Sequence, residues 1–229
     1  MSRITFLDNT LKSKYIKSFI GLYNRNKKLL AVSVTIFFVS LAIGVLIGYF
    51  LPDFTGHILT GVVQSIKSQI EKVTPFSIFT HNLKAALFSY FGGIIIGIIP
   101  AIELFSNGFI YGSFVGYFMH GGILSEYGIS SPVYFIIYTL PHGIFEIPAF
   151  IISCTAGFRL TSLVIGVLMS IIRKKPKNKH YWKFRDSLAL IVIAIALFFI
   201  AAIIEANFSV AVGNYITGSN LHQAVVKNY

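Results

Sequence analysis

The stretch from Pro132 to Ile172, PVYFIIYTLPHGIFEIPAFIISCTAGFRLTSLVIGVLMSII, decides what class of protein this chain is. Its 41 residues include only two charged side chains, Glu146 and Arg159. As one helix it would be roughly 60 Å long, about twice the thickness of a bilayer's hydrocarbon core. Proline removes a backbone donor and kinks or ends a helix. We therefore expect Pro141 and Pro148 to divide a membrane-embedded segment.

The composition of the whole chain supports a membrane protein. Of 229 residues, 55% are hydrophobic and 12% are charged, whereas soluble domains average about 45–50% and about 25%. These values exclude soluble globular, disordered and disulfide-stapled classes. The single cysteine, Cys154, can form no disulfide within the chain.

Four further apolar stretches lie outside the first one, at residues 29–50, 76–99, 104–120 and 187–204. The first contains 22 residues without a charge, which is enough to cross a bilayer. It is too long for a signal peptide and has no small-residue cleavage site before Pro52, so we expect an anchor. The predicted fold is an all-α polytopic membrane protein with about five full spans and a re-entrant or broken helix.

Two basic blocks predict the orientation in the cell membrane. Fifteen of the 19 basic residues lie within residues 3–28 or 159–185. Because cytoplasmic loops are enriched in Lys and Arg, we expect both blocks in the cytoplasm. Residues 1–28 then form a basic amphipathic cytoplasmic segment, residues 29–206 one transmembrane domain with a basic loop at about 173–186, and residues 207–229 an outer tail. Blocks that flank apolar runs explain the net charge of +11 without a nucleic-acid partner.

The number of crossings between the two blocks must be even if both are cytoplasmic. Two crossings within 132–172 would give five crossings in total, which is odd. We therefore expect either 132–147 or 107–120 to be re-entrant. Irregular backbone at membrane depth is tolerated only where protein or a cavity surrounds it, so residues 132–148 are the first place to look for function.

Two segments have the apolar periodicity of helices that lie on the membrane surface. In 56–74, apolar residues recur every three or four positions from Ile58 to Val73. We expect an amphipathic helix on the outer face. The first 23 residues repeat the pattern with a basic polar face, which favours anionic lipid.

Glycines at four-residue spacing predict close contacts between helices. Such series place glycine on one helix face and let another backbone approach. They are Gly44/Gly48, Gly93/Gly97 and Gly108/Gly112/Gly116. The spacing fits packing within one chain and also packing between the two chains of a homodimer.

Ionisable and amide side chains in or beside the apolar stretches are the candidate functional residues, because burying them in a membrane is costly. They are His81, Asn82, Lys84, Glu103, Asn107, His120, His142, Glu146, Arg159 and Glu205. His142 and Glu146 are four residues apart and would lie on the same side of one helical turn. Glu103 and Asn107 have the same spacing.

The His142 and Glu146 pair is open to three chemical interpretations. Imidazole and carboxylate are ligands for zinc or a similar divalent ion, with a third ligand from His81, Glu103 or His120. The second interpretation is a relay, in which the two side chains pass a proton or an ion along. The third interpretation is a hydrogen-bonded network, with Glu146 paired to His142, Lys84 or Arg159. No resident cofactor is predicted, and the chain has no phosphate-binding loop, nucleophile elbow or His-Glu-x-x-His motif.

Several runs resemble the stage II sporulation protein M family. The most specific are LPHGIFEIPA at 140–149, AGFRL at 156–160 and AAIIEA at 201–206. Upstream, Phe79-x-x-Asn82, Gly92–Gly97, Pro100, Leu104, Asn107-Gly108 and Gly112 also match. The resemblance implies a multi-span membrane protein whose shared polar residues include Asn82, Asn107, His142, Glu146 and Glu205. The sporulation member is a membrane anchor for a peptidoglycan-degrading machine, a role that need not extend to relatives in organisms without murein.

Three functions follow from these observations. The first is a membrane scaffold or assembly protein, dimeric and working with membrane or cell-envelope partners, more consistent with a non-enzyme. The second is a transporter or channel component, because broken helices and buried polar groups build transport sites. The third is an intramembrane metal-dependent hydrolase, which requires an ion with an open coordination position. A cavity that reaches Glu146 would favour the second and third functions, and a dry, fully paired site the first.

Overall fold

The computed structural model describes residues 2–69, 74–122, 132–174, 176 and 180–209. Six α-helices and a short π-helix make up nearly all of this part of the chain, and no strand occurs in it. The predicted all-α class is therefore confirmed. The elements are α1 (Ser2–Phe50), α2 (Pro52–Gln69), α3 (Pro75–Gly92), α4 (Ile98–Met119), α5 (Pro132–Ile172), α6 (Tyr181–Ile204) and η3 (Glu205–Ser209). The predicted outer tail lies mostly outside the described residues.

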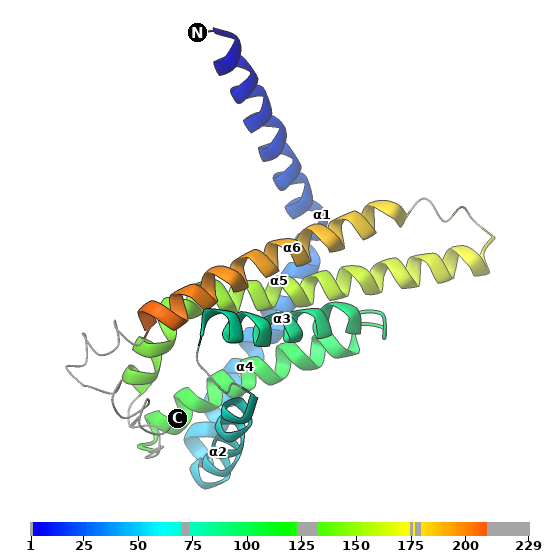
Figure 1. The fold of residues 1–229 in the computed structure, drawn as a ribbon. Helices are drawn as coiled ribbons and strands as arrows, with labels where there is room; N and C mark the ends of the chain where they lie inside the picture. Colours follow the sequence, from blue (N-terminus) through cyan, green and yellow to red (C-terminus); the bar gives the residue numbers. More distant parts are fainter. Residues whose placement is uncertain (1, 70–73, 123–131, 175, 177–179, 210–229) are drawn as a thin grey trace.

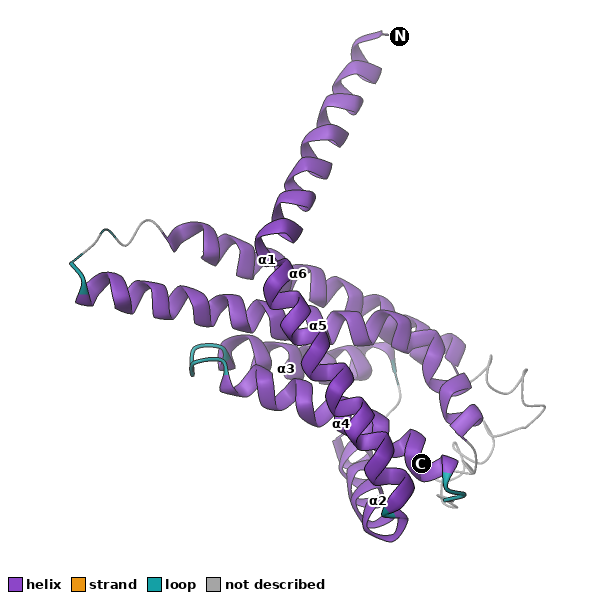
Figure 2. Ribbon diagram, turned by 180° about the vertical axis from the view of Figure 1, so that it is seen from behind, coloured by secondary structure: helices purple, strands orange, loops and turns teal. Residues whose placement is uncertain are grey.

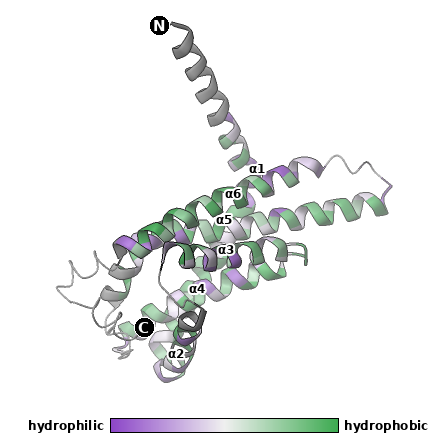
Figure 3. Cartoon of the chain, viewed as in Figure 1, coloured by the Kyte–Doolittle hydropathy of each residue, from purple (hydrophilic) through white to green (hydrophobic). Residues whose placement is uncertain are grey.

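Among the described residues, four helices are long and apolar enough to cross a membrane. The qualifying segments are Lys17–Phe50, Ile98–Met119, Thr139–Ile172 and Tyr181–Asn207. Large apolar side chains on their outer sides, such as Leu168 and Val192, are more than half exposed. Figure 3 shows the hydrophobic colour of most residues along α5 and α6. Such surfaces are expected where lipid surrounds a protein, so the polytopic membrane class is confirmed.

The helices run alternately in opposite directions through the bundle. Phe37, Leu41 and Val45 of α1 face Gly108, Gly112 and Gly116 of α4 in the same order, so these two helices are parallel. α5 and α6 are antiparallel, since the end of one meets the beginning of the other. Figures 1 and 2 show α3, α4, α5 and α6 side by side and α1 crossing them obliquely. α3 runs opposite to α4 and packs on α4, α5 and α6.

The glycines of α1 and α4 allow these two helices of the same chain to pack closely together. A Cβ on Gly112 would overlap the carbonyl oxygen of Leu41 and lie 2.9 Å from the Val45 nitrogen. Gly108 and Gly116 meet α1 in the same way, and Gly44 and Gly48 meet the backbone of α4. The predicted close helix contact is therefore present between α1 and α4. This face is covered and gives no argument for a homodimer.

The prediction that Gly93 and Gly97 line one helix face is wrong. The apolar stretch 76–99 is divided, because α3 ends at Gly92, residues 93–97 form a turn, and α4 begins at Ile98. Gly97 has a φ of +74°, a left-handed conformation that glycine adopts without steric cost. Gly93 instead allows the turn to approach the backbone of Gly157 in α5.

The expectation of a broken or re-entrant segment in 132–172 is also wrong. α5 is helical from Pro132 to Ile172, with Pro141 and Pro148 inside it, and Figure 1 shows it bending near its amino-terminal end. Packed neighbours can compensate for the donor that a proline removes in a membrane helix. The segment at 107–120 is not re-entrant either, because it belongs to the long helix α4. Because α5 runs through the bundle only once, its carboxy-terminal end returns to the end of the bundle where the first basic block lies. Both basic blocks are therefore at the same end.

The amphipathic segment predicted at 56–74 is helical over most of its length, as α2. Its buried residues are Thr55 and Leu59, and Leu59 contacts a small cluster centred on Phe118 of α4. Ile58, which the periodicity placed on the apolar face of a membrane-surface helix, is 36% exposed. The position of this helix on the outer membrane surface stays a prediction.

Candidate functional site

A cavity of about 360 Å³ lies inside the bundle, close to α2 and to the carboxy-terminal end of α6. Every helix contributes to its wall. Apolar side chains such as Phe37, Phe150 and Phe198 form one part of the lining. The polar part consists of His81, Asn82, Asn107, Thr139, His142, Glu146 and Glu205. Five of these seven were singled out by the sequence as a shared polar core.

His142 and Glu146 reach the cavity from one turn of α5. Residues four apart on a helix are neighbours on its surface. Nε2 of His142 lies 3.7 Å from Oε2 of Glu146, and the two side chains are 12% and 21% exposed. The bent part of α5 between Pro141 and Pro148 carries both side chains, so the predicted pair is present and faces the interior.

Glu205 completes a cluster with this pair from a different helix. One ligand atom each of His142, Glu146 and Glu205 lies within 4.8 Å of the other two. Glu205 is the first residue of η3, where α6 changes to π-helical hydrogen bonding. Short π-helical turns often occur at functional sites because they redirect side chains. The third ligand-type residue is therefore Glu205 and not His81, Glu103 or His120.

His81, Asn82 and Asn107 surround the cluster without joining it. His81 and Asn82 reach the cavity from α3, and Asn82 is only 9% exposed. Asn107 donates from Nδ2 to the carbonyl oxygen of Glu103, which fixes its amide one turn above Glu103 in α4. These groups add an imidazole and two amides to the polar lining.

The cavity is not lined by three other candidates, which are Lys84, Glu103 and His120. Glu103 does not line it, although it shares a helix with Asn107. The ring of His120 packs edge-on against Tyr49 of α1, with 5.6 Å between ring centroids. The sequence could not distinguish these residues from those that line the cavity. The spacing of residues along one helix does not determine which neighbouring helix each side chain faces.

Arg159 belongs to a second polar cluster, far along α5 from Glu146. Its Nε donates to Oδ1 of Asn26 at 2.5 Å, and its Nη2 donates to the carbonyl oxygen of Arg25. Asn26 in turn donates to Oδ2 of Asp186 at 3.0 Å, and Arg25 binds both oxygens of Asp186. The suggested pairing of Glu146 with Arg159 is therefore wrong. Asp186, the lone acid directly before the apolar stretch 187–204, is the signal that sequence reasoning missed.

The His142, Glu146 and Glu205 cluster has the chemistry of a divalent-cation site. Imidazole nitrogen and carboxylate oxygen bind zinc and similar ions at about 2.0–2.2 Å, so ligand atoms on one ion are at most roughly 4.4 Å apart. The observed limit of 4.8 Å requires only a small side-chain movement to reach that range. Three protein ligands would leave at least one coordination position open.

The fold and the site together define an all-α polytopic membrane protein with a polar cavity inside its helix bundle. The family model for stage II sporulation protein M matches residues 33–210, which include the last three candidate spans, part of the first one and every polar residue of the cavity. The chain belongs to this family, as its resemblance at residues 140–149 indicated.

Two proteins of the archaeon Methanocaldococcus jannaschii are similar to this chain. Uncharacterized protein MJ0793 is 35% identical over 141 residues, which cover 61% of this chain and 73% of that protein. Uncharacterized protein MJ0706 is 28% identical over 199 residues, which cover 81% of this chain and 83% of that protein. No solved structure matches the chain.

Proposed function

We propose that this protein is a transport component that binds a divalent cation in the membrane through His142, Glu146 and Glu205. The observation that carries the proposal is the meeting of these three ligand-type side chains in a cavity of about 360 Å³. Carboxylates inside a membrane bundle are costly and commonly mark ion pathways. A bound divalent cation would offset that cost by neutralising both carboxylates.

The cavity supports this function over a purely structural role. In a scaffold, the buried polar groups would be stabilised best by direct pairing in a closed core. The Arg159 cluster has that arrangement, with hydrogen bonds between α1, α5 and α6. The cluster at Glu146 instead borders open space that is large enough for an ion and its remaining water ligands.

Metal-dependent hydrolysis is the second candidate function. It is favoured by one further observation, which is that His81 lines the same cavity and is not one of the three clustered ligands. A hydrolase needs a group outside the metal's ligand set to accept a proton from the attacking water. In the hydrolase alternative, His81 is the group that accepts this proton.

Purified protein should contain close to one zinc or manganese ion per chain when it is prepared without chelator. Glu146→Gln and Glu205→Gln should each abolish this content, because an amide is a poor ligand for such ions. Elemental analysis of the detergent-solubilised protein measures it. Glu103→Gln is the matched control, since it removes a carboxylate outside the cavity and should retain the ion. Metal-free wild-type protein that cannot be loaded with either ion would refute the site.

The same variants separate transport from the alternatives. In liposomes containing a metal-sensitive dye, the wild-type protein and Glu103→Gln should admit Zn²⁺ or Mn²⁺, whereas Glu146→Gln should not. Circular dichroism and gel filtration must show that the variant remains folded. Ion binding without flux would argue against transport. In that case, loss of activity toward a model peptide or ester in His81→Ala, with the metal retained, would support the hydrolase.

We further propose that the amino-terminal end is cytoplasmic and the carboxy-terminal end is outside. The two basic blocks meet where Arg25 of α1 binds Asp186 at the beginning of α6. Placing this end in the cytoplasm satisfies the preference of Lys and Arg for that side. Because α1, α4 and α6 all run away from this end, η3 then lies toward the outside.

Cysteine labelling should reveal this orientation. Cys154 is fully buried, so the wild-type protein should not react with a membrane-impermeant maleimide. Asp53→Cys, at the exposed start of α2, should react in intact cells. Arg173→Cys, at the exposed end of α5, should react only in inverted membrane vesicles. The reverse pattern would overturn the proposed orientation.

A further inference from the structure

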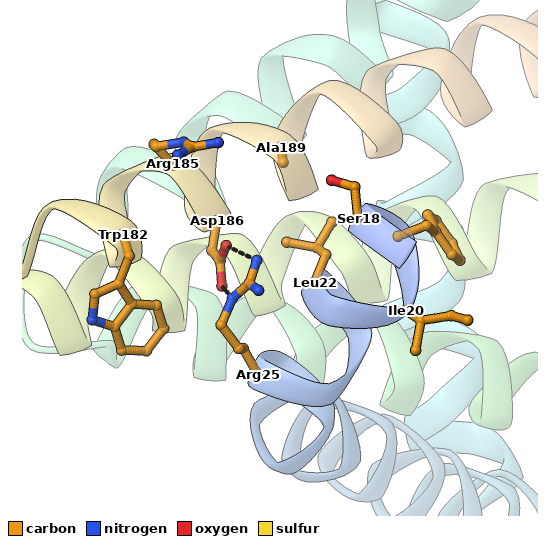
Figure 4. Close-up of a pocket in the computed structure, with 9 residues that line it drawn as sticks. Ser18, Ile20, Leu22, Arg25, Trp182, Arg185, Asp186 and Ala189 are labelled. Atoms are coloured by element: carbon orange, nitrogen blue, oxygen red, sulfur yellow. Dashed lines mark hydrogen bonds and ion pairs between the residues drawn. The ribbon is translucent and has the colours of Figure 1, made fainter. Parts of the chain in front are cut away.

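A second, larger cavity of about 800 Å³ lies between the first half of α1 and the beginning of α6. Arg25, Trp182, Arg185 and Asp186 form its polar part, together with Ser18. Figure 4 shows the ion pair between Arg25 and Asp186, with Trp182 to its left and Arg185 above Asp186 in the view. This cavity is separate from the cation cluster, because the two share no lining residue.

The cavity carries an excess of positive charge. Oδ1 of Asp186 accepts from Arg25, and its Oδ2 accepts from both Arg25 and Asn26, so this carboxylate is fully engaged. The Arg25 side chain is nevertheless 46% exposed, whereas that of Asp186 is 5% exposed. In the described part of the chain, no carboxylate forms an ion pair with Arg185. An anion in the cavity would therefore meet two guanidinium groups and a carboxylate that is turned inward.

The opposite wall of the cavity is apolar and continues into the bundle. Phe19 and Ile20 are more than half exposed, and Leu22 lies between α1 and α6. Phe19 and Leu22 also border a neighbouring cavity of about 100 Å³ that extends along α1 and α6 to Leu30 and Ile193. Apolar side chains form most of its lining, which also includes Asn26 and Thr155. The space thus changes from basic to apolar as it passes toward the interior of the membrane-spanning bundle.

We propose that this space is a binding site for one anionic phospholipid. The phosphate lies among Arg25, Arg185 and Trp182, and an acyl chain follows the apolar wall past Phe19 and Leu22. Basic pockets between spanning helices on the cytoplasmic side are suited to anionic head groups. Tryptophan favours the boundary between the head groups and the hydrocarbon region. The lipid would join α1 to α6 at their crossing, independently of the cation site.

Native mass spectrometry of the detergent-solubilised full chain tests this site. Dioleoyl phosphatidylglycerol should bind with a stoichiometry of one and more tightly than dioleoyl phosphatidylcholine. Arg185→Gln should weaken the phosphatidylglycerol complex about fivefold, as expected for one basic residue. Phe19→Ser should weaken binding of both lipids, because it removes the apolar wall and keeps the charge.

Two controls make the test specific. Arg173→Gln removes the same charge from an exposed position at the end of α5, outside the cavity, and should leave phosphatidylglycerol binding unchanged. Glycerol phosphate, which has the head group and no chains, should not bind measurably at the lipid concentrations used. Equal losses in Arg173→Gln and Arg185→Gln would show diffuse electrostatic attraction and overturn the site. Binding of glycerol phosphate as tight as that of the lipid would overturn the assignment of a phospholipid.

Discussion

Replacement of Gly112 by valine should destabilise the protein by about 3 kcal/mol, the upper part of the usual range for overpacking. The new Cβ would overlap the carbonyl oxygen of Leu41, which is a backbone atom of α1 and cannot rotate away. The two parallel helices would have to separate along their whole contact. In a membrane, the loss is mainly of van der Waals packing, because lipid is as apolar as the side chains that the helices bury.

The measurement is unfolding of the purified protein in mixed micelles with increasing dodecyl sulfate. Gly61→Val in α2 is the matched control, because a Cβ at Gly61 meets no atom within 4 Å. It introduces the same side chain into a helix without a clash and should change the unfolding midpoint little. Equal midpoints for the two variants would show that α1 and α4 do not pack as closely as the structure indicates.

This glycine contact shows which part of helix packing a sequence can predict. The four-residue spacing of Gly108, Gly112 and Gly116 correctly predicted a close approach of another helix. It could not identify α1 as that helix, because the spacing describes only one of the two surfaces. The same spacing at Gly93 and Gly97 marks a turn, where the positive φ of Gly97 is the relevant property. Glycine periodicity alone does not distinguish these two uses.

The prolines of α5 show the opposite limitation. Local chemistry predicts that Pro141 and Pro148 interrupt a helix, yet α5 continues through both. Packing of α5 against α1, α3, α4 and α6 keeps the remainder of the helix in place. The resulting bend lies where His142 and Glu146 project into the cavity. The sequence therefore predicted the position of the irregularity and mistook a bent helix for a broken one.

The sequence predicted the local pair of the candidate site and named Glu205 as a polar core residue, but it did not predict that Glu205 joins the pair. The helical spacing of His142 and Glu146 was sufficient to place them together. Glu205 lies at the end of the last span, and nothing in the intervening sequence indicates that α6 returns beside the bend of α5. Its place in the cluster depends on the antiparallel packing of α5 and α6, which is a property of the whole bundle.

Replacement of Asp186 by asparagine should destabilise the protein by about 3 kcal/mol, the lower part of the range for removing one partner from a buried ion pair. Within the described residues, Asp186 is the one carboxylate in contact with the cluster of Arg25, Asn26 and Arg159. Arg159 is only 5% exposed, so its charge would lose the nearby compensation of a carboxylate. Arg25 is partly solvated and should contribute less to the loss.

The same micelle unfolding experiment measures this effect, with Asp53→Asn as the matched control. Asp53 is exposed at the start of α2, and its replacement should change stability by no more than about 0.5 kcal/mol.

A second variant, Asn26→Leu, tests whether the amide is needed as a bridge. Asn26 accepts from Arg159 and donates to Asp186, so its loss should destabilise the protein even though both charges remain. If Asp186→Asn were no less stable than Asp53→Asn, the cluster would not hold α1, α5 and α6 together. The large effect is expected because Asn26, Arg159 and Asp186 are buried, and neither lipid nor the apolar protein interior could solvate their polar groups.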